Sequence, residues 1–236
     1  MTDDPHPPTK GDEPQPADGN GPIRPELGVF RVVLIYGVMA LIGWGMALWS
    51  LGRGPLLASE ASEVVPLWHA VALGAGLGLV VALLDLLLER WIPAVRQMGE
   101  AFYELLGVMT PGRALVFAAS SAVGEEIVFR GWLLPWSADM AAWLATLVAP
   151  EWTFEGWSWV GIGVSSVLFG AMHIPPDRRL WVWPLLAALM GVLFGWMFVS
   201  TGSLLAPILA HFTINYFGFM RLASRWAGEA RVDPPG

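Results

Sequence analysis

Residues 120–131 read SSAVGEEIVFRG, so two adjacent glutamates and an arginine lie within a segment that is otherwise apolar. An ionised side chain at the centre of a bilayer costs roughly 2.5–3.5 kcal/mol on insertion scales, so such residues face a protein interior and commonly carry function. Glu126 and Arg130 are four positions apart, which puts them on one helix face and predicts an ion pair. Glu125 is turned about 100° away and is left as the freer carboxylate, which suits a general base.

The sequence around this stretch is typical of an integral membrane protein. Of the 236 residues, 55% are hydrophobic and 14% are charged, whereas soluble domains have about 25% charged residues. Six apolar segments are each close to the roughly 20 residues that a helix needs to cross a bilayer. They are 28–51, 65–88, 113–136, 157–174, 181–200 and 204–223. The sequence therefore predicts an all-α, polytopic membrane helix bundle with about six transmembrane helices.

Two further segments are too short or too polar to be spans. Residues 89–110 carry apolar side chains at spacings of three and four among charges, which predicts an amphipathic helix. Such a helix lies on the membrane interface or packs as an ordinary surface helix against the bundle, and both alternatives stay open. Residues 138–149 are interpreted as a re-entrant or interfacial helix.

The distribution of charge predicts an orientation. Eleven of the 13 Lys and Arg residues fall on one side of the six-span arrangement, so the positive-inside rule predicts that both termini are cytoplasmic. We expect the membrane to be a bacterial inner (plasma) membrane. No basic patch indicates a nucleic-acid partner, and the absence of cysteine excludes thiolate chemistry.

Two later apolar segments contain polar residues at helical spacing. Phe169 and His173 are four positions apart at the end of the fourth segment, and His211 and Asn215 are four apart in the sixth. Because the fourth and sixth segments run opposite to the third, these groups are expected to converge with Glu125 in the cytoplasmic half of the bundle. A carboxylate, two imidazoles and an amide around one cavity would form a reaction site, although each residue alone is also compatible with a packing role.

The three motifs in this order resemble those of a known protease family. EExxxR at 125–130, FxxxH at 169–173 and HxxxN at 211–215 are similar to the motifs of the CPBP family. This is the CAAX prenyl protease 2 and bacteriocin-processing (Abi) group of glutamic-type intramembrane proteases. The resemblance covers residues 113–223. It implies a protease domain over 28–225, between a disordered tail at 1–27 and a flexible C-terminal tail at 226–236.

The resemblance also implies roles for the site residues. Glu125 would activate the hydrolytic water with help from His173, His211 and Asn215 would stabilise the oxyanion, and Glu126, Arg130 and Phe169 would support the site. No cofactor is certain, and a Zn²⁺ ion held by Glu125, His173 and His211 is the alternative that the sequence leaves open. The patterns HExxH, GxGD and GxSxG of other intramembrane hydrolases are absent.

The expected activity is hydrolysis of a peptide bond in a membrane-associated substrate near the cytoplasmic face. The partners are thus the lipid bilayer and a peptide or protein, which is a prenylated CAAX-like sequence, a leader peptide or a sorting tag. A non-catalytic membrane scaffold or a maturation or immunity partner is the alternative, in which the same polar residues only hold helices together. A proton-coupled carrier is disfavoured because no half-to-half repeat is present.

Overall fold

The computed structural model describes residues 28–57, 64–149, 151 and 156–232, and within these ranges the elements are helices. In chain order they are α1 (Val29–Leu51), α2 (Leu67–Trp91), α3 (Pro93–Leu106), α4 (Pro111–Glu126), η1 (Ile127–Leu133), α5 (Leu134–Val148), α6 (Trp157–Met172), η2 (Arg178–Leu180), α7 (Val182–Thr201) and α8 (Leu205–Val232). The all-α prediction is confirmed. The tail expected at 1–27 lies outside the described residues, and α8 extends past the expected domain boundary at 225.

Several of these helices are long and apolar enough to cross a bilayer. In the described part of the chain, α1, α2 and the run Arg178–Thr201 qualify by length and composition, and a fourth span results if α3 and the bent-away run Pro111–Val148 are counted as one. Large apolar side chains lie on their outer surfaces, such as Phe30 and Trp49, which are 76% and 80% exposed. Exposed apolar side chains of this size are favourable in contact with lipid tails and unfavourable in contact with water. The membrane helix bundle is confirmed, and the number six stays a prediction.

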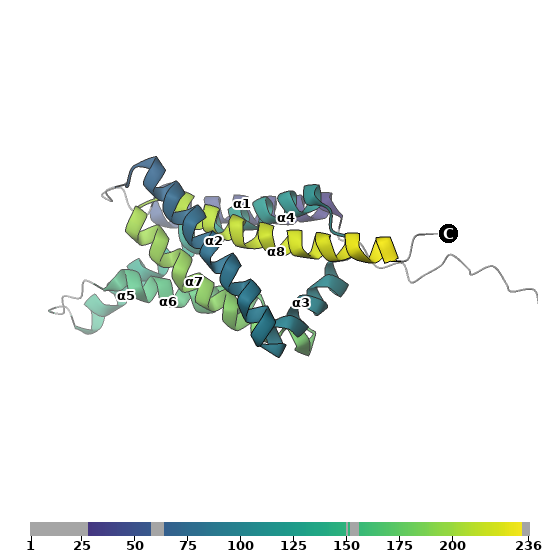
Figure 1. The fold of residues 1–236 in the computed structure, drawn as a ribbon. Coiled ribbons are helices and arrows are strands. Elements are labelled where there is room, and N and C mark those ends of the chain that lie inside the picture. Colours follow the sequence, from purple (N-terminus) through teal and green to yellow (C-terminus); the bar gives the residue numbers. More distant parts are fainter. Residues whose placement is uncertain (1–27, 58–63, 150, 152–155, 233–236) are drawn as a thin grey trace, which may run out of the picture.

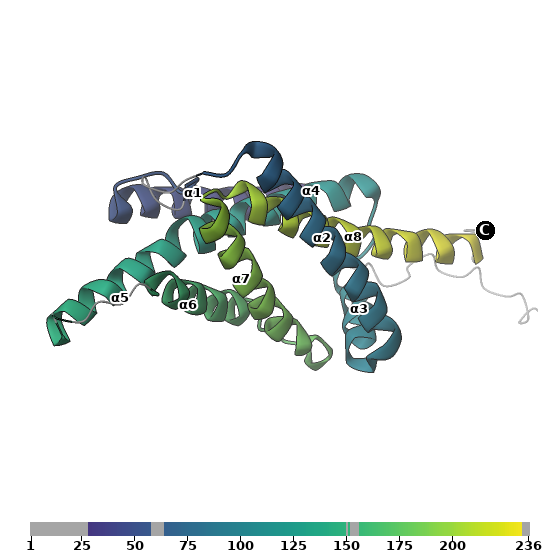
Figure 2. The ribbon, with the colours of Figure 1, turned by 60° about the vertical axis from the view of Figure 1, so that its left-hand side comes forward.

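The helices pack in two groups. α4 lies along α1 and α8, and α2 crosses α8, while α6 packs against both α5 and α7 (Figures 1 and 2). The run from α4 through η1 to α5 connects the two groups. The residues at the centre of this run therefore contact both groups, and Glu125 and Glu126 are the last residues of α4.

This central run differs from the sequence prediction. The segment expected to end at Trp136 and the separate short helix expected at 138–149 form one continuous helical run to Val148. The reason lies in η1, a π-helix in which the backbone N–H of Leu134 donates to the carbonyl of Phe129. The wider turn carries the helix past Pro135, which has no N–H to donate.

The amphipathic segment forms the predicted helix over a shorter range, as α3. It starts with Pro93 and ends at Gly107, whose φ of 65° is in the left-handed region that glycine tolerates. Glu104 of α3 forms an ion pair with Arg179 of η2, with 2.7 Å between the nearest N and O atoms. This contact fixes α3 beside the chain that follows α6. Its placement on a membrane surface stays a prediction.

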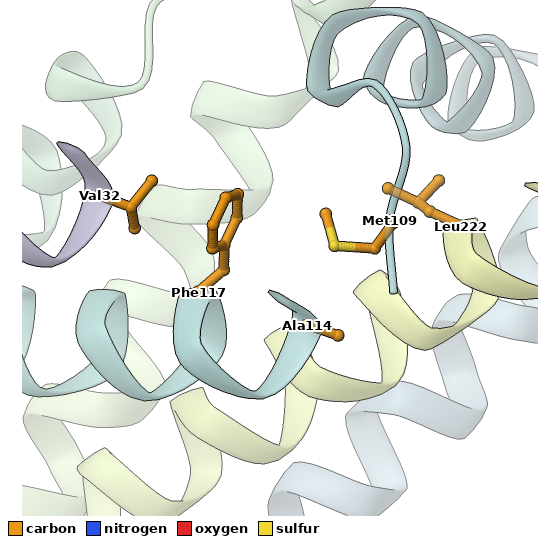
Figure 3. Close-up of a cluster of buried hydrophobic side chains, with 5 residues drawn as sticks. All are labelled: Val32, Met109, Ala114, Phe117 and Leu222. Atoms are coloured by element: carbon orange, nitrogen blue, oxygen red, sulfur yellow. The ribbon is translucent and has the colours of Figure 1, made fainter. Parts of the chain in front are cut away.

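A cluster of buried apolar side chains fixes the first half of α4. Figure 3 shows Phe117 between Val32 of α1 and Met109, with Leu222 of α8 beyond Met109. The cluster joins α1, α4 and α8 two turns before the glutamates. The burial of these side chains thereby holds α4, which ends in Glu125 and Glu126, against α1 and α8.

The loop after α1 covers the opposite end of the bundle. Leu57 bridges Ser203, and the N–H of Leu204 donates to the carbonyl of Leu56 over 3.0 Å. Pro55 is fully buried in this loop, and a Cβ atom added to Gly131 of η1 would lie 2.4 Å from the Cβ of Pro55. The loop therefore sits directly on the π-helix that follows the glutamates.

Glycines allow α2 to approach α8 closely. A Cβ atom added to Gly74 would lie 2.4 Å from the carbonyl oxygen of Ala206, and one added to Gly78 would lie 2.8 Å from that of Ala210. Small residues at such positions are what close helix packing in membranes requires. Gly76, which lies between them in the sequence, has no neighbouring atom within 4 Å of the corresponding position.

We expect Gly74→Ala to destabilise the bundle and Gly76→Ala to leave it unchanged. The new methyl group at position 74 meets rigid backbone, so α2 and α8 have to separate, at a cost of roughly 1–3 kcal/mol. Thermal unfolding of the two variants in detergent measures the difference. Equal midpoints for both variants would contradict the close α2–α8 packing.

Candidate active site

The two adjacent glutamates are buried side by side at the junction of α4 and the π-helix. Glu125 is 6% exposed and Glu126 is fully buried. π-Helical turns recur at functional sites, where they alter the direction in which side chains project. The burial of two carboxylates requires partners for their charge, and the two glutamates have different ones.

Glu126 is paired as its spacing from Arg130 predicts. Arg130 Nη1 donates to Glu126 Oε1 over 2.9 Å, and both side chains are fully buried. The same oxygen lies 2.8 Å from His211 Nδ1. Because the carboxylate paired with an arginine only accepts, His211 carries a proton on Nδ1 and leaves Nε2 to face elsewhere.

Aromatic rings complete the surroundings of Arg130. Its guanidinium carbon lies 4.4 Å from the ring centre of Phe169, 5.3 Å from that of Phe194 and 5.9 Å from that of Phe129. Each distance is within the range of a cation–π interaction. Within the described residues, Arg130 Nε and Nη2 have no hydrogen-bond partner, so ring faces take the place of water around this charge.

Glu125 lies between two imidazoles without contacting either closely. Its Oε2 atom is 3.9 Å from His173 Nε2 and 3.6 Å from His211 Nε2. Both distances exceed a direct hydrogen bond, and in the described part of the chain this buried oxygen has no hydrogen-bond partner. Three polar atoms from α4, the end of α6 and α8 thus converge, as the motif order predicts.

Backbone geometry fixes the tautomer of His173. Its Nδ1 lies 2.6 Å from the carbonyl oxygen of Phe169, one turn earlier. A carbonyl only accepts, so Nδ1 carries the proton and Nε2 presents a lone pair toward Glu125. Phe169 therefore contributes through its backbone to His173 and through its ring to Arg130.

Asn215 is placed one turn further along α8. Its Nδ2 donates to Ser121 Oγ over 3.0 Å, and Ser121 precedes Glu125 by one turn of α4. Asn215 therefore lies on the α4–α8 interface, one turn from His211. Its direct role in a reaction stays a prediction.

Three aromatic residues lie at the site that no sequence pattern predicts. Phe194 of α7 stacks on the His211 ring at 5.1 Å between centres, and Trp183 meets the His173 ring edge-on at 4.7 Å. Tyr36 of α1 lies beside Glu125. Aromatic residues are abundant throughout the apolar segments, so nothing in their spacing distinguishes these three from residues that only pack.

The residues do not form a metal site. Within the ranges that the structure describes, no group of three or more His, Cys, Asp or Glu residues is arranged to hold a metal ion. The set proposed from the sequence, Glu125, His173 and His211, contributes two free Nε2 atoms and one oxygen but does not meet this arrangement.

Comparison with known proteins identifies the central part of the chain. Residues 108–217 match the model of a protein family described as type II CAAX prenyl endopeptidase Rce1-like. The matched range includes all three motifs and excludes α1 and α2. The chain has no match among curated proteins and none among solved structures. The family resemblance drawn from the motifs is confirmed.

Proposed function

Because residues 108–217 match the Rce1-like family of type II CAAX prenyl endopeptidases, we propose that the chain is an intramembrane endopeptidase in which Glu125 activates water. The family supplies the reaction class, which is peptide-bond hydrolysis at a membrane. The catalytic type, the side of the membrane and the substrate are our proposals.

One observation carries the role of Glu125. Its buried Oε2 atom has no hydrogen-bond partner among the described residues, yet it lies 3.6 and 3.9 Å from two imidazole nitrogens. A polar contact longer than 3.5 Å commonly holds a bridging water. One water placed to the side of these atoms at about 2.8 Å from each would be bound by the base that deprotonates it.

In the proposed reaction one C–O bond forms, the peptide C–N bond breaks, and Glu125 carries a proton from the water to the leaving amine. Glu125 takes a proton from the water while the water oxygen bonds to the peptide carbonyl carbon, which gives a tetrahedral intermediate. The C–N bond then breaks, and Glu125 returns the proton to the leaving amine. His173, which presents the lone pair of Nε2, accepts a hydrogen bond from the attacking water and orients it.

His211 is proposed to stabilise the negative charge that develops on the peptide carbonyl oxygen. When His211 is protonated, Nδ1 donates to Glu126 and Nε2 is free to donate to the carbonyl oxygen. Asn215 has a second N–H beyond the one given to Ser121, and it is the other proposed donor. Fixed donors of this kind stabilise an oxyanion without reorganising. Glu126 and Arg130 hold His211 in place through the 2.8 and 2.9 Å contacts.

We propose the cytoplasmic face of a bacterial inner membrane as the site of cleavage, with both termini cytoplasmic. The asymmetry of 11 of 13 basic residues supports this orientation. The substrate is a membrane-associated peptide, of which a prenylated CAAX-like C-terminus is the case that the family description suggests.

The test uses the chain in sealed membrane vesicles with two peptides of identical sequence, one farnesylated near its C-terminus and one unmodified. We expect mass spectrometry to detect cleavage when peptide is added to inside-out vesicles and none with right-side-out vesicles. Preference for the farnesylated peptide would assign the substrate class. The proposal is wrong if neither peptide is cleaved and if cells with and without the chain show the same membrane-protein cleavage products.

Metal dependence is a separate arm of the same assay. We expect cleavage to persist after treatment with a zinc chelator, because the proposed base acts on water directly. Loss of activity in chelator together with recovery on adding zinc would instead establish a metalloprotease, and it would leave the peptidase assignment intact.

A further inference from the structure

Helix α1 lies outside the family-matched range, yet it touches the site directly. A Cβ atom added to Gly124 would lie 2.8 Å from the carbonyl oxygen of Tyr36, 3.1 Å from its Cβ and 3.2 Å from its Cδ1. Gly124 immediately precedes the two glutamates. Because Gly124 has no side chain, α1 approaches α4 closely at this position, and Tyr36 fills the space that a side chain would take.

The side chain of Tyr36 is held on both sides. It is half-buried and packs against the apolar cluster of Val32, Met109, Ala114, Phe117 and Leu222. Its side chain lies beside Glu125, next to the Gly124 backbone. The ring thus has a fixed position beside the residue that the reaction depends on.

This contact fills a gap in the site. Glu126 is held by Arg130 and His211, but the imidazoles around Glu125 are 3.6 and 3.9 Å away. A carboxylate without a close donor is free to rotate about its last side-chain bond, and misorientation of a reacting group lowers the rate strongly. A tyrosine hydroxyl stays protonated at neutral pH, so it remains a donor and does not compete as a base.

We propose that Tyr36 is a positioning residue for peptide cleavage: its hydroxyl donates to the Glu125 carboxylate and keeps that group facing His173 and His211. The active site therefore includes α1 as well as the family-matched helices. This inference rests on the proposed function of Glu125 as the base.

The first test is Tyr36→Phe, which removes the hydroxyl and keeps the ring. We expect kcat to fall roughly tenfold to a hundredfold, the range for one hydrogen bond to a charged group, with KM and the unfolding midpoint unchanged. Tyr216→Phe is the matched control, because Tyr216 packs on the same apolar cluster, and we expect wild-type kinetics. A Tyr36→Phe enzyme with wild-type kcat overturns the inference.

A second measurement does not require cleavage. Dicyclohexylcarbodiimide modifies protonated carboxyl groups in membranes, and a hydrogen bond to the anionic form keeps a carboxyl deprotonated. We expect Glu125 to be labelled faster in Tyr36→Phe than in the wild type, with Tyr216→Phe at the wild-type rate, as measured by fragment mass spectrometry of the peptide containing Glu125.

The two readouts separate the two ideas. Faster labelling of Tyr36→Phe in a chain that cleaves nothing would refute the peptidase function and preserve the Tyr36–Glu125 contact. Active wild-type enzyme with equal labelling and equal kcat in Tyr36→Phe would refute the contact and preserve the function.

Discussion

We expect Glu125→Gln to abolish detectable cleavage while the protein accumulates to the wild-type level. The amide has the shape of the carboxylate but cannot accept the proton of water, and the loss of a general base costs about 10²–10⁴-fold in rate. We expect the fold to persist, because Glu125 Oε2 has no hydrogen-bond partner among the described residues and the amide keeps one oxygen that can accept a hydrogen bond from Tyr36. Product formation per mole of purified protein in vesicles is the measurement.

Glu104→Gln is the control for this change. Glu104 is a half-exposed carboxylate on α3, and the same chemical replacement there is expected to leave the rate unchanged. Retained cleavage in Glu125→Gln would exclude Glu125 as the base. Loss of assembly or of protein level instead of turnover would favour the scaffold interpretation, in which buried polar residues only hold helices together.

Arg130→Met is expected to have the largest effect on stability. Both Arg130 and Glu126 are fully buried, so the substitution leaves a carboxylate in the interior with His211 as its remaining close partner. Breaking a buried ion pair from one side costs roughly 3–5 kcal/mol. The loss of the contacts with the rings of Phe169 and Phe194 adds to this. Denaturation in mild detergent measures the change.

The double variant Arg130→Met with Glu126→Gln separates charge from packing. Removing both charges is expected to recover much of the stability, because a neutral amide costs far less to bury than an unpaired carboxylate. Activity is not expected to return, since His211 loses the anion that orients it. A single Arg130→Met variant as stable as the wild type would show that the pair contributes little to the fold.

The sequence identified the polar half of the site because polar residues are conspicuous in an apolar chain. The spacing of Glu126 and Arg130 predicted their contact, and the order of the motifs predicted that Glu125, His173 and His211 converge. Burial of charge is costly enough that few arrangements satisfy it. The physical constraint therefore made this part of the structure predictable.

The apolar half of the site could not be found in the same way. Phe194, Trp183 and Tyr36 lie next to His211, His173 and Glu125, but in a chain with 14 Trp and 11 Phe their positions carry no distinguishing pattern. The π-helix was also missed, because an α-turn and a π-turn differ by one residue in hydrogen-bond spacing and have no separate composition. The sequence therefore predicts a break before residue 138 that the continuous helical run to Val148 does not have.

The loop that covers η1 bears on how a hydrolase operates inside a barrier. A site that holds water within a bilayer would conduct protons if it were open at both ends. Here the Leu57–Ser203 bridge holds a loop whose buried Pro55 packs against Gly131 of η1, whereas His173 follows the end of α6. We expect access from one face only, so that peptide cleavage proceeds without discharging the electrochemical gradient across the membrane.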